Sequence, residues 1–258
     1  MAADVLLERD GCVATVTLFN PGKLNAINAA MWRRLAAVMT EVDADCDLRA
    51  VVVRGNGTAF AAGGDLNEFH HERADSERAL AYHKAVGAAL QAVALCRHPT
   101  VALLLGPCIG GGLEIACACD LRIAGESVRL GAPINKLGFS MYPGELAYLL
   151  QLAGPAVAKE ILLEGRLLTA PEGYEKGLVT RIVPDASAEI EAYATARRIA
   201  DGAPLAARAH KRWITRLLDG RPLSEEEKHA SFAFLDTDDY REGLDAFKDK
   251  RRPVFKGR

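Results

Sequence analysis

The sequence has no marked excess of charge of either sign. Its 258 residues include 32 Lys or Arg and 34 Asp or Glu, which gives a formal net charge of −2 at pH 7. Proteins that bind duplex nucleic acid usually present a markedly basic face. The near balance of charge gives no such electrostatic signature, and we expect no nucleic-acid partner.

Cysteine is too sparse for a disulfide framework. Six cysteines are spread over the chain, and several stand among apolar residues, where cysteine behaves as a small buried hydrophobe. Cys117 and Cys119 lie two positions apart, without a second Cys/His pair at the spacing of metal ligands. We therefore expect neither structural disulfides nor a metal site.

Long apolar runs are missing as well. No stretch approaches the ~18 continuous apolar residues of a membrane span. Asp4, Glu8 and Arg9 stand where a signal peptide would be apolar. We expect no membrane contact, and a reducing cytoplasm as the cellular location.

Segments typical of strands alternate with segments typical of helices. The strand segments are short, apolar and followed by turn residues; they are 13–19, 49–54 and 100–105. Apolar residues at helical spacing cover 28–42, where Asn28 can cap the helix, and 79–95. This alternation predicts an α/β fold with a mainly parallel sheet.

Helices dominate the last part of the chain, after about residue 145, where 178–183 is the strand segment. No fixed repeat or low-complexity linker divides the sequence. We predict an α/β core over residues 1–200 and a helical region over residues 201–258.

The segment Gly106-Pro-Cys-Ile-Gly-Gly-Gly112 follows a strand and opens a helix. Its glycines let a ligand approach the backbone closely, and free N–H groups at a helix start attract negative charge. No Gly-Lys-Ser/Thr follows, as it would in a phosphate-binding loop, and Ile115 occupies the third glycine position of a dinucleotide loop. What remains is a backbone anion hole with one carboxylate, Glu114, in the first turn of the helix.

Glu114 has two interpretations. An acid in a first turn can simply stabilise the helix dipole, but its apolar neighbours favour a buried carboxyl group with a raised pKa. The segment Phe60-Ala-Ala-Gly-Gly-Asp65 is by itself most simply a tight turn. Two such turns after neighbouring parallel strands would face one crevice, which is where α/β sheets bind ligands.

Taken together, these motifs resemble the crotonase (enoyl-CoA hydratase/isomerase) superfamily. Segments 59–66 and 106–114 carry the two loop motifs, and shorter matches continue to 253–257. The resemblance implies a spiral of β-β-α units with a helical C-terminal region that packs subunits into homotrimers or homohexamers. It also implies acyl-CoA substrates, with coenzyme A as part of the substrate and no separate cofactor.

The resemblance implies roles for particular residues. The backbone N–H groups of Ala62 and Gly111 would hold the thioester oxygen and stabilise an enolate, with Glu114 as the general base. Further positions implied in substrate binding are Lys23, Ala61, Gly63, Asp65, Leu66, Gly110 and Ile134. Lys23 is a candidate for the coenzyme A phosphates, as are Lys248, Lys250 and Arg251, although each is more simply a solvated surface residue.

The sequence departs from the family pattern at the second catalytic glutamate. Ile134 stands where that glutamate would follow the proline of its motif, so the matched general acid is absent. Tyr142 and Glu145 lie in the next loop, where some isomerases of the family carry their acid/base glutamate. His71 could face the acyl pocket, although a solvated helix position is the simpler interpretation.

Three hypotheses stay open. Glu145 or Tyr142 replaces the missing acid and supports hydration or double-bond isomerisation. Alternatively, Glu114 works alone as a single-carboxylate isomerase or thioesterase-like enzyme. In the third, the protein binds acyl-CoA without catalysis. A serine nucleophile elbow is not indicated, because Gly138-Phe-Ser-Met-Tyr142 lacks the closing glycine.

Overall fold

The computed structural model describes residues 2–258 and has a six-stranded sheet at its centre, in the order β1-β2-β3-β4-β6-β9. The strands are β1 (Asp4–Asp10), β2 (Val13–Phe19), β3 (Ala50–Gly55), β4 (Thr100–Leu104), β6 (Leu121–Gly125) and β9 (Arg181–Val183). β1 and β2 form an antiparallel hairpin, and all later pairs in this sheet are parallel. The mainly parallel α/β fold predicted from the sequence is confirmed.

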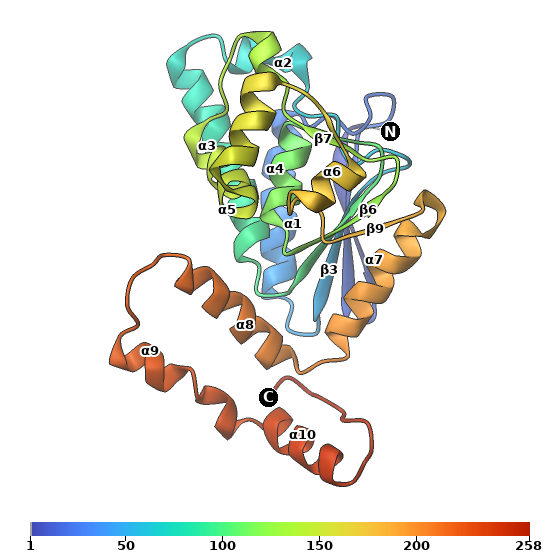
Figure 1. Cartoon of the computed structure of the whole chain (residues 1–258), viewed down its shortest axis with the longest axis vertical. Coiled ribbons are helices and arrows are strands. Elements are labelled where there is room, and N and C mark those ends of the chain that lie inside the picture. The colour runs from blue at the N-terminus through green and yellow to red at the C-terminus, as the bar shows by residue number, and fades with distance from the viewer. Residues whose placement is uncertain (1) are drawn as a thin grey trace.

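Helices cover both faces of this sheet (Figure 1). They are α1 (Ala29–Ala44), α2 (Leu66–Glu72), α3 (Ser76–Leu95), α4 (Gly111–Ala118), α5 (Pro143–Lys159), α6 (Ala170–Glu175) and α7 (Asp185–Ala200), with the short turns η1 (Ile134–Leu137) and η2 (Glu160–Glu164). Asn28 caps α1 by accepting a hydrogen bond from the Met31 N–H, as predicted.

The two faces of β3 explain the layers. Val51 and Val53 belong to the core cluster that contains α1, α3 and α4, whereas Val52 belongs to a second cluster with the alanines of α7. Successive side chains of a strand point to opposite faces, so a run of valines can be buried on both sides. Small alanines at Ala188 and Ala192 let α7 approach the sheet closely.

A smaller sheet extends the carboxyl ends of these strands. It contains β5 (Pro107–Ile109), β7 (Arg129–Gly131) and β8 (Leu168–Thr169), and Ala61 bridges to Cys108 at its edge. The loop after β3 and the loop before α4 are thereby held side by side.

The predicted strand 178–183 is shorter than expected. Only Arg181–Val183 forms β9, because the N–H groups of Leu178 and Val179 both donate to the Gly173 carbonyl and close the end of α6 instead.

The long helix made by α5 and η2, Pro143–Glu164, is apolar enough by length and composition to cross a membrane. Its backbone is broken at Gly154, where φ is +74°, directly before Pro155. Leu149 and Ile161 lie in the main core cluster, so in this fold the helix packs on the α/β domain.

The last part of the chain forms an arm that extends away from the sheet (Figure 1). It consists of α8 (Pro204–Leu217), α9 (Glu225–Ala230), the turn η3 (Ala233–Asp236) and α10 (Asp238–Lys248). Lys211 of α8 joins it to the domain through an ion pair of 2.7 Å with Asp120.

Candidate active site

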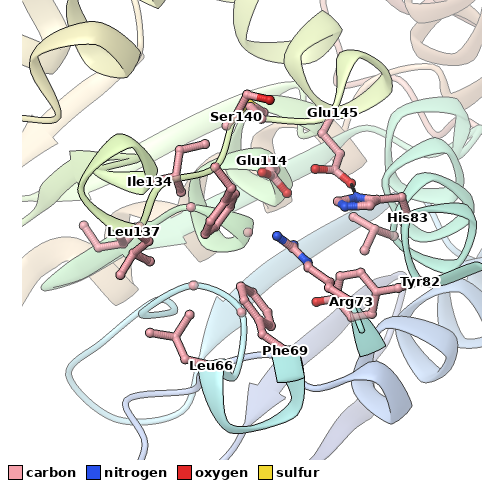
Figure 2. Close-up of a pocket in the computed structure, with 18 of the residues that line it drawn as sticks. Leu66, Phe69, Arg73, Tyr82, His83, Glu114, Ile134, Leu137, Ser140 and Glu145 are labelled. Carbon is pink, nitrogen blue, oxygen red and sulfur yellow. Dashed lines mark hydrogen bonds and ion pairs between the residues drawn. The ribbon is translucent and has the colours of Figure 1, made fainter. Parts of the chain in front are cut away.

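A cavity of about 210 Å³ lies between the loop after β3, the start of α4, η1 and the start of α5 (Figure 2). Among the positions expected to contact substrate, it is lined by Ala62, Gly63, Leu66, Gly110, Gly111 and Ile134. Glu114 and Glu145 line the same cavity. The two loop motifs singled out from the sequence therefore do meet at one site.

The backbone of the first loop corrects one expectation. The Ala62 N–H donates to the Leu24 carbonyl at 3.0 Å, so it is not available to a ligand. The Ile27 N–H donates to the Gly63 carbonyl, and the Asp65 N–H donates to the Ile27 carbonyl. Gly64, between them, is the residue paired with Ile27 in this parallel bridge. The Gly64 N–H therefore points away from Ile27, and no residue within 2–258 accepts a hydrogen bond from it. Gly64 also lines the cavity.

Gly111 offers the second backbone donor. It is the first residue of α4, where N–H groups have no intrahelical acceptor. A Cβ atom at Gly111 would lie 2.8 Å from Trp32 Cζ2, so only glycine fits there. The expectation for Gly111 as a free donor agrees with this geometry, whereas Gly64 takes the place of Ala62.

Glu114 lies in the first turn of α4, a helix whose residues are all buried. Burial raises the pKa of Glu114 to about 8; the negative charge of Glu145 adds to this effect and the positive charge of Arg73 opposes it. Of the two interpretations left by the sequence, the buried carboxyl group is the one that the structure supports.

Glu145 lies in the first turn of α5 and is 4% exposed. Its Oε1 is 2.5 Å from Nδ1 of His83 on α3, and the labelled side chains in Figure 2 show this pair above the cavity. The sequence spacing gave no sign of His83 as the partner, because 62 residues separate it from Glu145.

Tyr142 does not join the site. It precedes α5, is 39% exposed, and stacks on His83 with ring centroids 4.8 Å apart. The cavity is lined by Glu145 but not by Tyr142. Of the two replacements considered for the missing acid, Glu145 is therefore the one in position.

Asp65, Lys23 and Ala61 have structural roles. Asp65 caps α2 and forms an ion pair of 2.6 Å with Lys23, which holds the pKa of Asp65 below its usual value. Ala61 is buried; its N–H donates to the Pro107 carbonyl and its carbonyl accepts from the Ile109 N–H. None of these three lines the cavity.

Two further candidates have acidic partners that do not line the cavity. His71 is largely exposed and bonds to Glu72, which fits the solvated position considered for it. On the arm, Arg251 pairs with Glu242 at 2.6 Å. Over residues 2–258, no group of three or more His, Cys, Asp or Glu side chains is arranged to hold a metal ion.

Arg73 is the functional candidate that sequence reasoning missed. It follows α2 and lines the cavity, with its guanidinium carbon 3.9 Å from the Phe69 ring centroid and 4.8 Å from that of Phe139. An arginine in a polar segment gives no signal of this kind, because only the folding of residues 66–98 over the cavity turns it inward.

Comparisons with known proteins identify the family of this chain. The family described as enoyl-CoA hydratase/isomerase matches residues 8–258. A probable enoyl-CoA hydratase of Mycobacterium bovis is 36% identical over 256 residues, which cover 97% of each chain. A crystal structure of an enoyl-CoA hydratase/carnitine racemase from Magnetospirillum magneticum has 49% identity and a TM-score of 0.97, over 98% of this chain and 96% of that one.

A family protein from Hyphomonas neptunium described as a hydratase/isomerase has 34% identity and a TM-score of 0.94, covering 98% of both chains. The match extends through the loops that build the cavity and through the arm. The chain belongs to the enoyl-CoA hydratase/isomerase family.

Proposed function

We propose that the protein catalyses the reversible addition of water to a 2-enoyl-CoA thioester, with Glu114 and Glu145 as its two proton-transferring groups. One observation carries the proposal: both carboxyl groups are buried and line one cavity, beside the backbone donors of Gly64 and Gly111. Hydration needs a base for the water and an acid for the α-carbon, and a cavity with two carboxyl groups can provide both.

The backbone donors would polarise the thioester carbonyl. Hydrogen bonds from Gly64 and Gly111 to the carbonyl oxygen stabilise the negative charge that develops when water attacks the β-carbon. In a site closed to water, one such donor contributes roughly 3–4 kcal/mol to the transition state. The two glycines lie on separate loops, so the hole depends on the pairing that holds these loops together.

The carboxyl groups would divide the proton transfer between them. Because burial and, to a lesser extent, the charge of Glu145 raise the pKa of Glu114 to about 8, Glu114 retains its proton near neutral pH. In hydration, Glu145 with its partner His83 takes a proton from water and Glu114 delivers one to the α-carbon. In the reverse reaction Glu114 is the general base, the role expected from the sequence.

Isomerisation is the second candidate, favoured by one observation. Ile134 places an apolar side chain in the cavity where the family motif has its second glutamate. A 1,3-proton shift needs one carboxyl group, and Glu114 alone would provide it. Neither a thioesterase-like activity nor binding without catalysis needs Glu145 buried against His83.

The test follows hydration of a short 2-enoyl-CoA by the loss of its conjugated thioester absorbance. We expect turnover in the unaltered protein, and a loss of at least about a hundredfold in both Glu114→Gln and Glu145→Gln. Glu126→Gln, at an exposed turn, is the matched control and should leave turnover unchanged.

Other outcomes separate the alternatives. Isomerisation of a 3-enoyl-CoA that needs Glu114 but tolerates Glu145→Gln would replace hydration by the second candidate. Binding of enoyl-CoA with no turnover would leave a non-catalytic acyl-CoA-binding protein.

We also infer that the chain forms a homotrimer or homohexamer through its C-terminal arm. The arm exposes large apolar side chains in the single chain; they include Ile214, Leu218, Phe232, Leu244 and Phe247. Large exposed apolar side chains gathered on one region of the chain are typical of interfaces between subunits.

A further inference from the structure

Arg73 is a cation inside a largely apolar cavity, and its hydrogen-bonding capacity is unused. The rings of Phe69, Phe139 and Tyr82 lie within 3.9–5.2 Å of its guanidinium carbon. Its Nε is buried without a hydrogen-bond partner. Aromatic rings attract the charge but accept no directed hydrogen bond from the guanidinium edge. A charge withdrawn from water is costly unless it is paired.

Neither carboxyl group of the site pairs with Arg73. In the part of the chain that the structure describes, no ion pair or side-chain hydrogen bond joins it to another residue. Glu145 is bonded to His83, and Glu114 is the group that retains its proton near neutral pH. The guanidinium fork, which suits two parallel bonds to a carboxylate, is therefore open toward the cavity.

The cavity has an exposed end and a buried end. Leu66 and Leu137 are 51% and 54% exposed, whereas Tyr82 is 3% exposed. Figure 2 shows the two leucines on one side of the cavity and Arg73, Tyr82 and His83 on the other. Coenzyme A is far too large for about 210 Å³, so it must stay at the exposed end, and the far end of a short acyl group then reaches Arg73.

We propose that Arg73 selects acyl groups that end in a carboxylate, so that the substrate is the CoA monothioester of a short unsaturated dicarboxylic acid. Only the unsaturation of the acyl group rests on the proposed function. The charge pairing with Arg73 concerns binding alone. The substrate carboxylate accepts two hydrogen bonds from the guanidinium, while the aromatic rings hold the guanidinium plane in place. An acyl chain that ends in a methyl group covers the same cation without pairing it, and leaves its buried Nε without a partner.

The experiment compares two saturated thioesters that cannot be hydrated, glutaryl-CoA and pentanoyl-CoA, which have the same acyl chain length. Calorimetry on the full chain should give a dissociation constant at least tenfold lower for glutaryl-CoA than for pentanoyl-CoA. A difference of this size is usual for a hydrogen-bonded pair of opposite charges. Arg73→Met should abolish or reverse this preference. Arg73→Lys, which keeps the charge but not the fork, should retain part of it.

Arg78→Met is the matched control, because Arg78 is an exposed arginine on the next helix and pairs with Asp75 outside the cavity. Its preference should equal that of the unaltered protein. A thermal melt of each variant separates loss of fold from loss of selectivity, and the ratio measured on the unaltered protein tests the proposal even if Arg73→Met does not fold.

Equal affinity for the two thioesters, or a preference that survives Arg73→Met, overturns the inference. Turnover of the matched unsaturated pair, glutaconyl-CoA and 2-pentenoyl-CoA, tests the proposed function separately from the selectivity of Arg73. A binding preference without hydration of either would support the role of Arg73 and contradict hydration. Hydration of both thioesters without any binding preference would do the opposite.

Discussion

At the scale of single residues, the site depends on carboxyl groups that the fold withdraws from water. Glu114 could be found in the sequence because it lies in a glycine loop with apolar neighbours, and burial does raise its pKa. His83 and Arg73 could not, since their roles come from contacts across the cavity. The sequence also could not decide whether Ala62 or Gly64 has the free N–H, because the direction of each N–H is set by pairing with Leu24 and Ile27.

The raised pKa of Glu114 makes the stability of the fold depend on pH. Below about pH 4.5, the ordinary value, folded and unfolded chains both hold this proton and it has no effect. Between that pH and about 8 the unfolded chain releases the proton that the folded chain keeps, so the contribution of Glu114 to stability falls as pH rises. Glu114→Gln has no proton to lose at this position.

We therefore expect Glu114→Gln to gain stability over the unaltered protein as pH rises from 5 to 8, by up to about 4 kcal/mol. Urea unfolding at pH 5, 6.5 and 8 measures the difference in the free energy of unfolding. Glu126→Gln, at a solvent-exposed turn, should show no such trend. A difference for Glu114→Gln that is constant with pH would mean that this carboxyl group is ionised in the folded protein.

At the scale of elements, the structure contains most of the strands and helices that periodicity and turn residues predict. The helix over 28–42 is observed as Ala29–Ala44, with its predicted cap. The strand over 178–183 was overestimated because apolar Leu178 and Val179 close α6 through Gly173. Periodicity reports which residues are buried, but not whether a short buried segment pairs with a strand or ends a helix.

The start of α4 is the element on which the site depends most directly. Gly111 packs against Trp32 with no room for a Cβ atom, so Gly111→Ala must move α4 or the indole ring. We expect a loss of about 1–3 kcal/mol in the free energy of unfolding and a larger relative loss of turnover, because the backbone donor moves with the helix. Denaturant unfolding and enoyl-CoA turnover measure the two effects.

Gly87→Ala is the matched control for this change. Gly87 lies within α3, and nothing stands within 4 Å of the position of an added Cβ atom. Alanine favours a helix interior over glycine by up to ~1 kcal/mol, so this variant should be as stable as the unaltered protein or more so, with its turnover retained. Similar losses in both variants would show that the packing of Gly111 on Trp32 has no special part in the site.

At the scale of the whole molecule, the arm is the part that a single chain does not explain. Polar contacts join the arm to the domain: Lys211 pairs with Asp120, and Arg49 donates to the carbonyl of Phe255. Much of the apolar surface of the arm stays exposed. Composition and periodicity predict that this region is helical, but not what covers it; the expectation of trimers or hexamers comes from the resemblance alone.

Phe247 and Phe232 offer a direct test of assembly, because they are 87% and 60% exposed in the single chain. If the arm packs subunits together, a carboxylate at these positions must be buried without a partner, which costs several kcal/mol. Sedimentation velocity should then show a trimer or hexamer for the unaltered protein and a shift toward monomer for Phe232→Glu/Phe247→Glu. Ile190→Glu, on α7 at 72% exposure, is the control and should keep the assembled state. A monomer in the unaltered protein would contradict the proposed assembly. Turnover that falls together with assembly would mean that the cavity needs the neighbouring subunits to work.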